Sequence, residues 1–223
     1  MFTRRRMTAL LLLGTTLLFG CAAPKPLANA CASPLTPAIA NSCVVTPGVL
    51  WRGAKPDAEG ATALLSLGVK TVVNLELLHS DLDAFRAARP PTATSASIDY
   101  FLVRDWEPNV VMMPALLDAH VADFIAIAKT QATPIYVHCR SGQNRTGVMI
   151  AAYRVLLEGV PMESAIAEMQ KFNGLWFKQD AAYLRGLTGE HRLKIEKMAA
   201  ARIGQIRREA HLEYSAAGCH ESK

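Results

Sequence analysis

Apolar residues follow two different spacings along most of this chain. Short runs rich in β-branched and apolar residues indicate buried strands, at residues 49–53, 70–78, 98–104 and 135–139. Longer stretches with apolar residues every three or four positions indicate helices. These stretches cover residues 57–67, 80–89, 115–129, 145–158, 161–172 and most of 177–214. Asp57 and Pro161 are suited to helix starts, and Gly68 to a helix end.

Strands alternate with helices from residue 49 onward. This order favours an α/β fold, in which a central, mostly parallel sheet of four to five strands is flanked by helices. The 223 residues suffice for one domain with a substantial core. We expect that domain at residues 46–215, followed by a short tail at 216–223. The segment 191–214 has apolar residues among Lys and Arg; we favour packing on its own domain over contact with a membrane surface.

The first 20 residues have a different character. Three arginines at positions 4–6 precede an apolar run that is too short for a comfortable membrane span, which is the layout of a secretory signal peptide. The run ends in LLFG before Cys21, which resembles the lipobox of bacterial lipoproteins. This resemblance implies a lipid anchor on Cys21 and a location on the periplasmic side of the cell envelope, and Ala22 favours the outer membrane. Because Phe19 is unusual in a lipobox, ordinary cleavage and an uncleaved anchor stay open.

Residues 21–45 are rich in small and polar residues and predict a flexible linker behind the lipidated terminus. Cys31 and Cys43 lie within it. In an oxidising compartment they could pair with each other, or either could pair with Cys219. The sequence leaves this pairing open.

The net charge of this protein excludes few classes of function or partner. The formal charge of +5 falls to +2 when the three arginines leave with the signal peptide. No basic run is interleaved with aromatic residues, so nothing in the composition supports nucleic-acid binding. No spacing of His, Cys, Asp or Glu indicates a metal site either.

The candidate chemistry lies in YVHCRSGQNRTGV, residues 136–148, which joins a predicted strand to a predicted helix. The first N–H groups of a helix have no partner within it, and the helix dipole is positive at that end. A loop wrapped around this end predicts a phosphate cradle. Its residues are Arg140, Ser141, Gly142, Gln143 and Asn144. Arg145 can hold two phosphate oxygens through its planar guanidinium.

The same positive field acts on Cys139. It favours the thiolate over the thiol, and a thiolate can attack phosphorus. Thr146 could donate its hydroxyl to the sulfur and make it a better leaving group. His138 is expected to shape the loop by bonding to nearby backbone. Arg140 points either toward a substrate or toward solvent. This chemistry needs no cofactor.

The pattern Cys-x5-Arg, with a histidine before it and Thr-Gly after it, resembles the signature of protein tyrosine and dual-specificity phosphatases. Three flanking stretches extend the resemblance over residues 44–175. They are VVTPGVLWRGAKPDAEG at 44–60, LLSLGVKTVVNLE at 64–76 and AAYRVLLEGVPMESAIAEM at 151–169. The resemblance implies hydrolysis of a phosphomonoester through a phosphocysteine intermediate on Cys139, without a metal.

The resemblance also implies an acid, because the family uses an aspartate on a mobile loop to protonate the leaving oxygen. The stretch RDWEPNV places Asp105 directly after a predicted strand, so Asp105 is the expected acid and Glu107 the alternative. Asp81 and Asp83 are interpreted as helix caps.

Three other side chains are singled out by their chemistry. His79 and His120 are expected at the surface. Arg52 either touches the loop or its ligand, or forms a salt bridge at the surface.

These features predict a protein tyrosine or dual-specificity phosphatase in the cell envelope, acting on a phosphorylated protein or a small phosphoester. A phosphoinositide or inositol phosphate phosphatase is an alternative, but such enzymes usually add lysines to the loop, which here contains Arg140 and no lysine. A catalytically silent module that binds phosphorylated ligands is the alternative from another class. A usable acid at Asp105 would separate the enzyme from the binding module.

Overall fold

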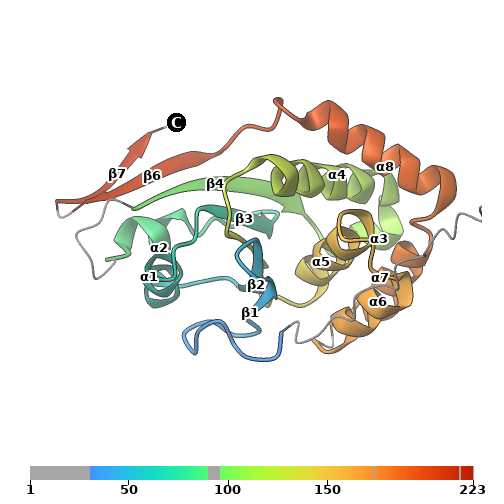
Figure 1. The fold of residues 1–223 in the computed structure, drawn as a ribbon, viewed down its shortest axis with the longest axis horizontal. Coiled ribbons are helices and arrows are strands. Elements are labelled where there is room, and N and C mark those ends of the chain that lie inside the picture. The colour runs from blue at the N-terminus through green and yellow to red at the C-terminus, as the bar shows by residue number, and fades with distance from the viewer. Residues whose placement is uncertain (1–30, 90–95, 173, 216, 223) are drawn as a thin grey trace, which may run out of the picture.

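A seven-stranded sheet forms the centre of the computed structural model, which describes residues 31–89, 96–172, 174–215 and 217–222 (Figure 1). The strand order is β1-β2-β5-β3-β4-β6-β7. The strands are β1 (Cys43–Thr46), β2 (Leu50–Ala54), β3 (Thr71–Glu76), β4 (Ala96–Asp105), β5 (Ile135–Cys139), β6 (Ala210–Ser215) and β7 (Gly218–Ser222). Strands β2, β5, β3 and β4 are parallel, whereas β1, β6 and β7 add antiparallel edges.

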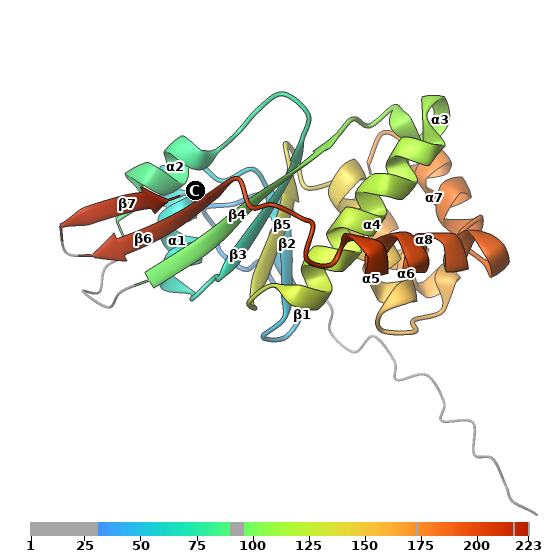
Figure 2. The same cartoon turned by 90° about the horizontal axis from the view of Figure 1, so that it is seen from above.

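Helices cover both faces of this sheet (Figure 2). They are α1 (Ala58–Ser66), α2 (Leu82–Ala87), α3 (Asn109–Met112), α4 (Pro114–Thr130), α5 (Asn144–Leu156), α6 (Met162–Gln170), α7 (Phe177–Arg185) and α8 (Gly189–Arg202). Helices α1 and α2 pack on one face, and α4 to α8 pack on the other. The predicted α/β fold with a mostly parallel sheet and flanking helices is therefore confirmed, but the sheet has seven strands rather than four to five.

Successive side chains of β3 pack into two hydrophobic cores, one on each face of the sheet. Val73 and Leu75 face the helices α4 to α8, whereas Val72 faces α1 and α2, because successive side chains of a strand point to opposite sides. All six residues of β3 are buried. This explains why the strand reads as a continuous apolar run rather than an alternating one.

The C-terminal region corrects the sequence prediction. The segment expected to be helical up to residue 214 ends its helix, α8, at Arg202, and Gly204 then adopts a φ of +80°. Ala210, Leu212 and Tyr214 are buried at every second position of β6, and the sequence AHLEYS already shows this strand period, which the helical prediction overlooked. The expected tail supplies β7. Helix α8 itself packs against α4 of its own domain, the alternative that the sequence favoured.

The predicted linker is also wrong in its second half. Cys31 and Cys43 form a disulfide, and Ile39, Ser42 and Cys43 are buried. Residues 31–45 therefore belong to the folded domain. The predicted signal peptide and lipidated Cys21 lie outside the described residues. In the ranges that the structure does describe, no helix is long and apolar enough to cross a membrane.

Candidate active site

The loop between β5 and α5 lies at the carboxyl end of the parallel strands. Strand β5 is buried throughout and has β2 and β3 as its neighbours, with Cys139 paired to Ala54 and His138 paired to Asn74. The Cys139 side chain is 1% exposed. Helix α5 begins at Asn144, so the N–H groups of its first turn lack helical partners, as the sequence predicted for an anion cradle.

Gly142 allows this loop to fold back onto β2. Its φ is +70°, a conformation that side chains rarely adopt. A Cβ atom at Gly142 would lie 2.5 Å from the carbonyl carbon of Gly53 and 2.7 Å from the nitrogen of Ala54. Since both obstacles are backbone atoms, only glycine fits at this position.

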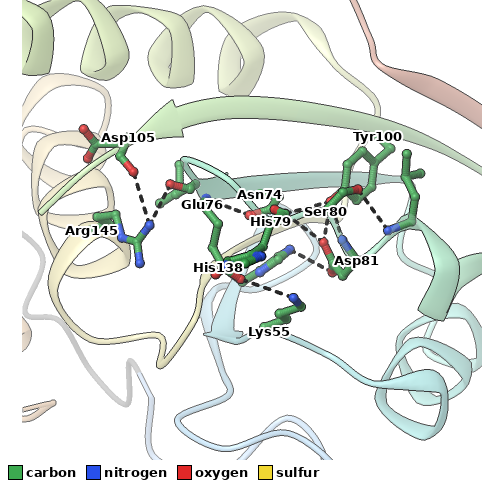
Figure 3. A network of polar contacts seen from close by, with 12 residues as sticks. Lys55, Asn74, Glu76, His79, Ser80, Asp81, Tyr100, Asp105, His138 and Arg145 are labelled. Atoms are coloured by element: carbon green, nitrogen blue, oxygen red, sulfur yellow. Dashed lines mark hydrogen bonds and ion pairs between the residues drawn. The ribbon is translucent and has the colours of Figure 1, made fainter.

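Arg145 lies against the base of the loop and contacts β3, β4 and the segment after β4; Figure 3 shows it beside Asp105. Its Nη1 atom donates to the carbonyl oxygens of Leu75 and Asp105, both at 3.2 Å. Its Nη2 atom lies 2.7 Å from a carboxylate oxygen of Glu107. The Nε atom is buried and has no hydrogen-bond partner among the described residues. One part of the guanidinium is thus held by backbone, while a displaceable carboxylate contacts the other.

The other loop side chains have different surroundings. Gln143 donates to the carbonyl oxygen of Phe172 at 2.8 Å, and Asn144 donates to the carboxylate of Asp180 at 3.2 Å. These two residues can therefore offer a phosphate their backbone N–H groups but not their side chains. Arg140 and Ser141 are exposed.

Thr146 follows Arg145 in the first turn of α5. Its hydroxyl is buried, and it has no hydrogen-bond partner within the part of the chain that the structure describes. This hydroxyl therefore has a donor free, and its bond to the Cys139 sulfur stays a prediction.

His138 does not make the backbone bond that the sequence predicted. Asp81 stands at the N-cap position of α2, as predicted, but its side chain does not cap the helix. The Nε2 atom of His138 lies 3.2 Å from Oδ2 of Asp81, and both side chains are fully buried. Asp81 also accepts hydrogen bonds from Tyr100 and Asn74, and its side chain makes no capping bond to α2. Figure 3 shows this network behind the loop. Asp81 thus holds His138, the residue before Cys139 on β5. The other two partners of Asp81 come from the neighbouring strands β3 and β4.

The charge state of Asp81 follows from these contacts. Burial acts to raise the pKa of the Asp81 carboxyl, but the charge and hydrogen bond of His138 and the hydrogen bond of Tyr100 outweigh it, and the pKa is lowered. Burial and the Asp81 charge raise the pKa of Tyr100. Asp81 is therefore a carboxylate at neutral pH, and Tyr100 remains its donor.

Asp105 lies beside the loop, but its carboxyl group does not face the guanidinium. The carboxylate accepts a hydrogen bond from Asn109 at 3.0 Å and lies 2.9 Å from Nδ1 of His120. Only its backbone carbonyl reaches Arg145 (Figure 3). His120 is therefore not the surface residue that the sequence predicted, because β4 and α4 pack together around it. His79 is exposed, as expected.

Comparison with known proteins connects this geometry to a family. A family model described as "DSP-PTPase phosphatase fused to NAD+ Kinase" matches residues 45–183. The dual specificity protein phosphatase TpbA of Pseudomonas aeruginosa strain UCBPP-PA14 is 30% identical over 167 residues, which are 70% of this chain and 69% of that protein. The TpbA of strain PAO1 is 30% identical over 141 residues, 61% of this chain and 58% of that protein.

The chain belongs to the dual-specificity phosphatase-like family. A solved structure has the same fold: the core catalytic domain of the PP-IP phosphatase SIW14 from S. cerevisiae. It superposes with a TM-score of 0.54 at 19% identity, and the match covers 72% of this chain and 94% of that one. Membership of this family supports phosphatase activity and agrees with the fold and the loop described above.

For this phosphatase, sequence reasoning missed several residues around the loop. Asn74, Tyr100 and Asp81 looked like ordinary strand or cap residues, and no local signal marks them. Asp180, in the first turn of α7, is buried beside Asn144. Burial raises the pKa of Asp180 to about 7, against the hydrogen bond from Asn144, and the charges of nearby carboxylates raise it further.

Among the residues that the structure describes, no three His, Cys, Asp or Glu side chains gather in a way that could hold a metal ion.

Proposed function

We propose that the protein hydrolyses phosphomonoesters through a phosphocysteine on Cys139, and that its substrate is a phosphorylated protein. The observation that carries this proposal is the loop itself. Cys139 and Arg145 stand at its two ends, and Gly142 packs it against β2. The Arg145 Nε and Thr146 hydroxyl groups are buried and have no partner among the described residues. Buried polar groups are rarely left unpaired, so these donors fit a phosphate and a thiolate.

In the first step the Cys139 thiolate attacks phosphorus and the bond to the leaving oxygen breaks. The backbone N–H groups of the loop and the guanidinium of Arg145 stabilise the charge on the three other phosphate oxygens. An acid supplies the proton that the leaving oxygen needs. In the second step water attacks phosphorus, the acid residue accepts a proton from it, and the bond between sulfur and phosphorus breaks. The Thr146 hydroxyl then stabilises the departing thiolate.

Asp105 remains the proposed acid, although its carboxylate is held away from the loop by Asn109 and His120. Glu107, two residues later, occupies the guanidinium of Arg145 with its own carboxylate. An incoming phosphate dianion competes directly with Glu107 for these donors. We propose that its displacement releases the segment from Asp105 to Glu107, which then carries Asp105 toward the leaving oxygen.

The preference for a phosphoprotein over an inositol phosphate rests on the loop and its surroundings. Arg140 is the single exposed cation between Cys139 and Arg145, and no lysine lies in the loop. The TpbA relatives are named dual specificity protein phosphatases. A panel of phosphotyrosine, phosphoserine and phosphothreonine peptides and of inositol phosphates tests this preference. Faster turnover of the inositol phosphates would reverse it.

The test of the mechanism is phosphate release from aryl phosphates by the full chain, with leaving groups of increasing pKa. Cys139→Ser should lose activity by at least about 10⁴-fold on every substrate, because the nucleophile is gone. Asp105→Asn should lose about 10²–10⁴-fold on poor leaving groups and far less on good ones, since only poor ones need the proton.

Glu107→Gln is the matched control for the acid. If it, rather than Asp105→Asn, shows the dependence on the leaving group, then Glu107 is the acid. If the wild-type chain binds phosphate but releases none from any ester under reducing conditions, the enzyme mechanism fails and the binding module replaces it.

We also propose that the domain works in the cell envelope, anchored through a lipid on Cys21. The sequence of residues 1–21 and the Cys31–Cys43 disulfide support an exported protein, because disulfides persist mainly in oxidising compartments. Mass spectrometry of the protein from its native membrane fraction should find a lipidated Cys21 at the mature N-terminus. A mature chain that begins elsewhere, without lipid, would contradict the anchor.

A further inference from the structure

Arg52 is a cation buried directly behind the phosphate loop. It lies in the middle of β2, where it pairs with Val137 of β5. Paired residues of neighbouring strands share a face, and Cys139 follows Val137 by two positions, so Arg52 and Cys139 lie on the same side of the sheet. Arg52 is 0% exposed, which excludes the surface salt bridge that the sequence left open.

The guanidinium of Arg52 has few partners for its five donors. Its Nη2 atom donates to the carbonyl oxygen of Gly142 in the loop. Its central carbon lies 3.5 Å from the centroid of the Phe172 ring, a cation–π contact. The Nε and Nη1 atoms are buried and have no hydrogen-bond partner among the described residues. No carboxylate of the described chain forms an ion pair with Arg52 within 4.0 Å.

This arrangement leaves a charge in the interior. Burial lowers the pKa of Arg52 to about 10, and the charges of Glu168, Cys139 and Tyr136 act in the opposite direction. The guanidinium therefore remains protonated at neutral pH. A buried charge without a bonded counter-ion is costly. Its retention is best explained if an anion forms close to it during the reaction.

The bond to Gly142 also orients the loop. The C=O and N–H groups of one trans peptide point in opposite directions. A Gly142 carbonyl that points to Arg52 therefore turns the N–H of Gln143 away from Arg52. Asn41 holds the preceding peptide in the same manner, since its amide donates to the carbonyl oxygen of Ser141 at 2.8 Å. Two successive peptides of the cradle are thus held by their carbonyl groups.

We propose that Arg52 is a positioning residue of the phosphate site: it fixes the Gly142–Gln143 peptide of the cradle, and its buried charge stabilises the thiolate and phosphate anions that form there. The role is carried through the loop, without direct contact to substrate, and it rests on the proposed function. Phe172 assists, because its ring confines the guanidinium and its backbone carbonyl accepts the hydrogen bond from Gln143.

Three variants of the full chain test this role. Arg52→Met removes the charge and keeps much of the volume, Arg52→Lys keeps the charge without the planar fork, and Phe172→Leu removes the ring. Arg208→Met is the matched control, because Arg208 is an exposed arginine that pairs with Asp99 far from the loop. Circular dichroism and urea unfolding select folded variants. The readouts are kcat and KM on an aryl phosphate, the rate of Cys139 alkylation by iodoacetamide at pH 6, and the Kd of inorganic phosphate by calorimetry.

We expect Arg52→Met to lower kcat/KM by about 10²-fold, the order seen when one preorganised donor to a developing anion is lost. Alkylation of Cys139 and phosphate binding should weaken with it. Arg52→Lys should recover part of all three quantities, and Phe172→Leu should lose about threefold to tenfold in kcat/KM. Arg208→Met should resemble the wild type.

A folded Arg52→Met variant with wild-type kinetics, alkylation and phosphate affinity overturns the proposal. If Arg52→Met does not fold, wild-type values in both Arg52→Lys and Phe172→Leu overturn it instead. Failure of the proposed function looks different. In that case the wild-type chain has no turnover, whereas the alkylation rates and phosphate affinities of the variants still decide the role of Arg52.

Discussion

Arg52 and Arg154 are both buried arginines on the same side of the sheet, but their surroundings differ. Arg154, in α5, donates to Glu168 at 3.0 Å and to the carbonyl oxygen of Val45 at 2.9 Å, and also pairs with Glu158. Burial acts to lower the pKa of Arg154, but the two glutamates outweigh it and the pKa is raised. Arg52 has one carbonyl and one ring as partners, and its pKa is lowered.

This contrast shows where in the fold buried polar side chains lack hydrogen-bond partners. The described residues with buried side-chain atoms that lack hydrogen bonds are Arg52, Glu76, Asp81, Asn109, His138, Arg145 and Thr146. Six of them belong to the loop and the first turn of α5, to the strands that carry the loop, or to the segment after β4, and Asp81 stands at the start of α2 beside His138. Away from the loop, Arg154 joins α5 to β1 and α6 with all three nitrogens bonded. Complete pairing stabilises the scaffold, whereas incomplete pairing at Arg145 and Thr146 leaves donors for an anion.

The largest expected effect is the loss of stability on replacing Arg154, the arginine with complete pairing. Arg154→Met should reduce the free energy of unfolding by about 3–5 kcal/mol, because it leaves the buried Glu168 without its partner. The kcat of the folded protein should stay near the wild-type value. Urea unfolding and kinetics at a temperature well below the midpoint measure both. Arg52→Met should show the reverse pattern, with little loss of stability and a large loss of activity. Equal stability losses in the two variants would break the distinction.

Asp180 extends the comparison to an acid beside the loop. Its pKa is about 7 when folded, against about 3.9 for an unfolded aspartate. Between about pH 4 and pH 7 the folded chain keeps a proton on Asp180 that the unfolded chain has released. The free energy of unfolding therefore falls as the pH rises through this range. Asp180→Asn removes the cost of the buried charge and should be more stable than the wild type at pH 8, by about 2–4 kcal/mol.

Urea unfolding of the wild type and Asp180→Asn at pH 4.5 and pH 8 measures this effect. The gain should be small at pH 4.5, where Asp180 is protonated in the folded protein. A gain of the same size at both pH values would show that Asp180 does not titrate between them.

The smallest expected effect concerns the ion pair between Glu107 and Arg145, because an incoming phosphate can displace the Glu107 carboxylate from the guanidinium. The Glu107 side chain is 30% exposed, and such ion pairs are worth about 0.2–1 kcal/mol. Glu107→Gln should therefore lower the inhibition constant of inorganic phosphate by about two- to fivefold at low ionic strength. Competitive inhibition assays against an aryl phosphate measure it. An unchanged or higher constant would mean that Glu107 does not compete with the ligand.

Much of the site could be predicted from the sequence, because its residues are close together along the chain. Cys139, Gly142, Arg145 and Thr146 lie within eight consecutive residues, and the strand–loop–helix context follows from hydrophobic spacing. Apart from the short helix α3, the elements from β2 to α7 lie where this spacing predicted them. The partners of these residues are not local. Asp81 lies 57 residues from His138, and Arg52 lies 90 residues from Gly142, so no spacing rule connects them.

The family, the parallel core of the sheet and the phosphate loop could be predicted from the sequence, because each rests on short-range periodicity or on residues that are contiguous in the chain. Three outcomes depended on tertiary packing: which buried charges are paired, that the Asp105 carboxylate contacts His120, and that residues 31–45 and 218–222 join the domain. These outcomes depend on strand order and on packing between distant segments. The physical reason is that burial and pairing of a charge are properties of its whole surroundings, whereas local patterns record only its neighbours along the chain.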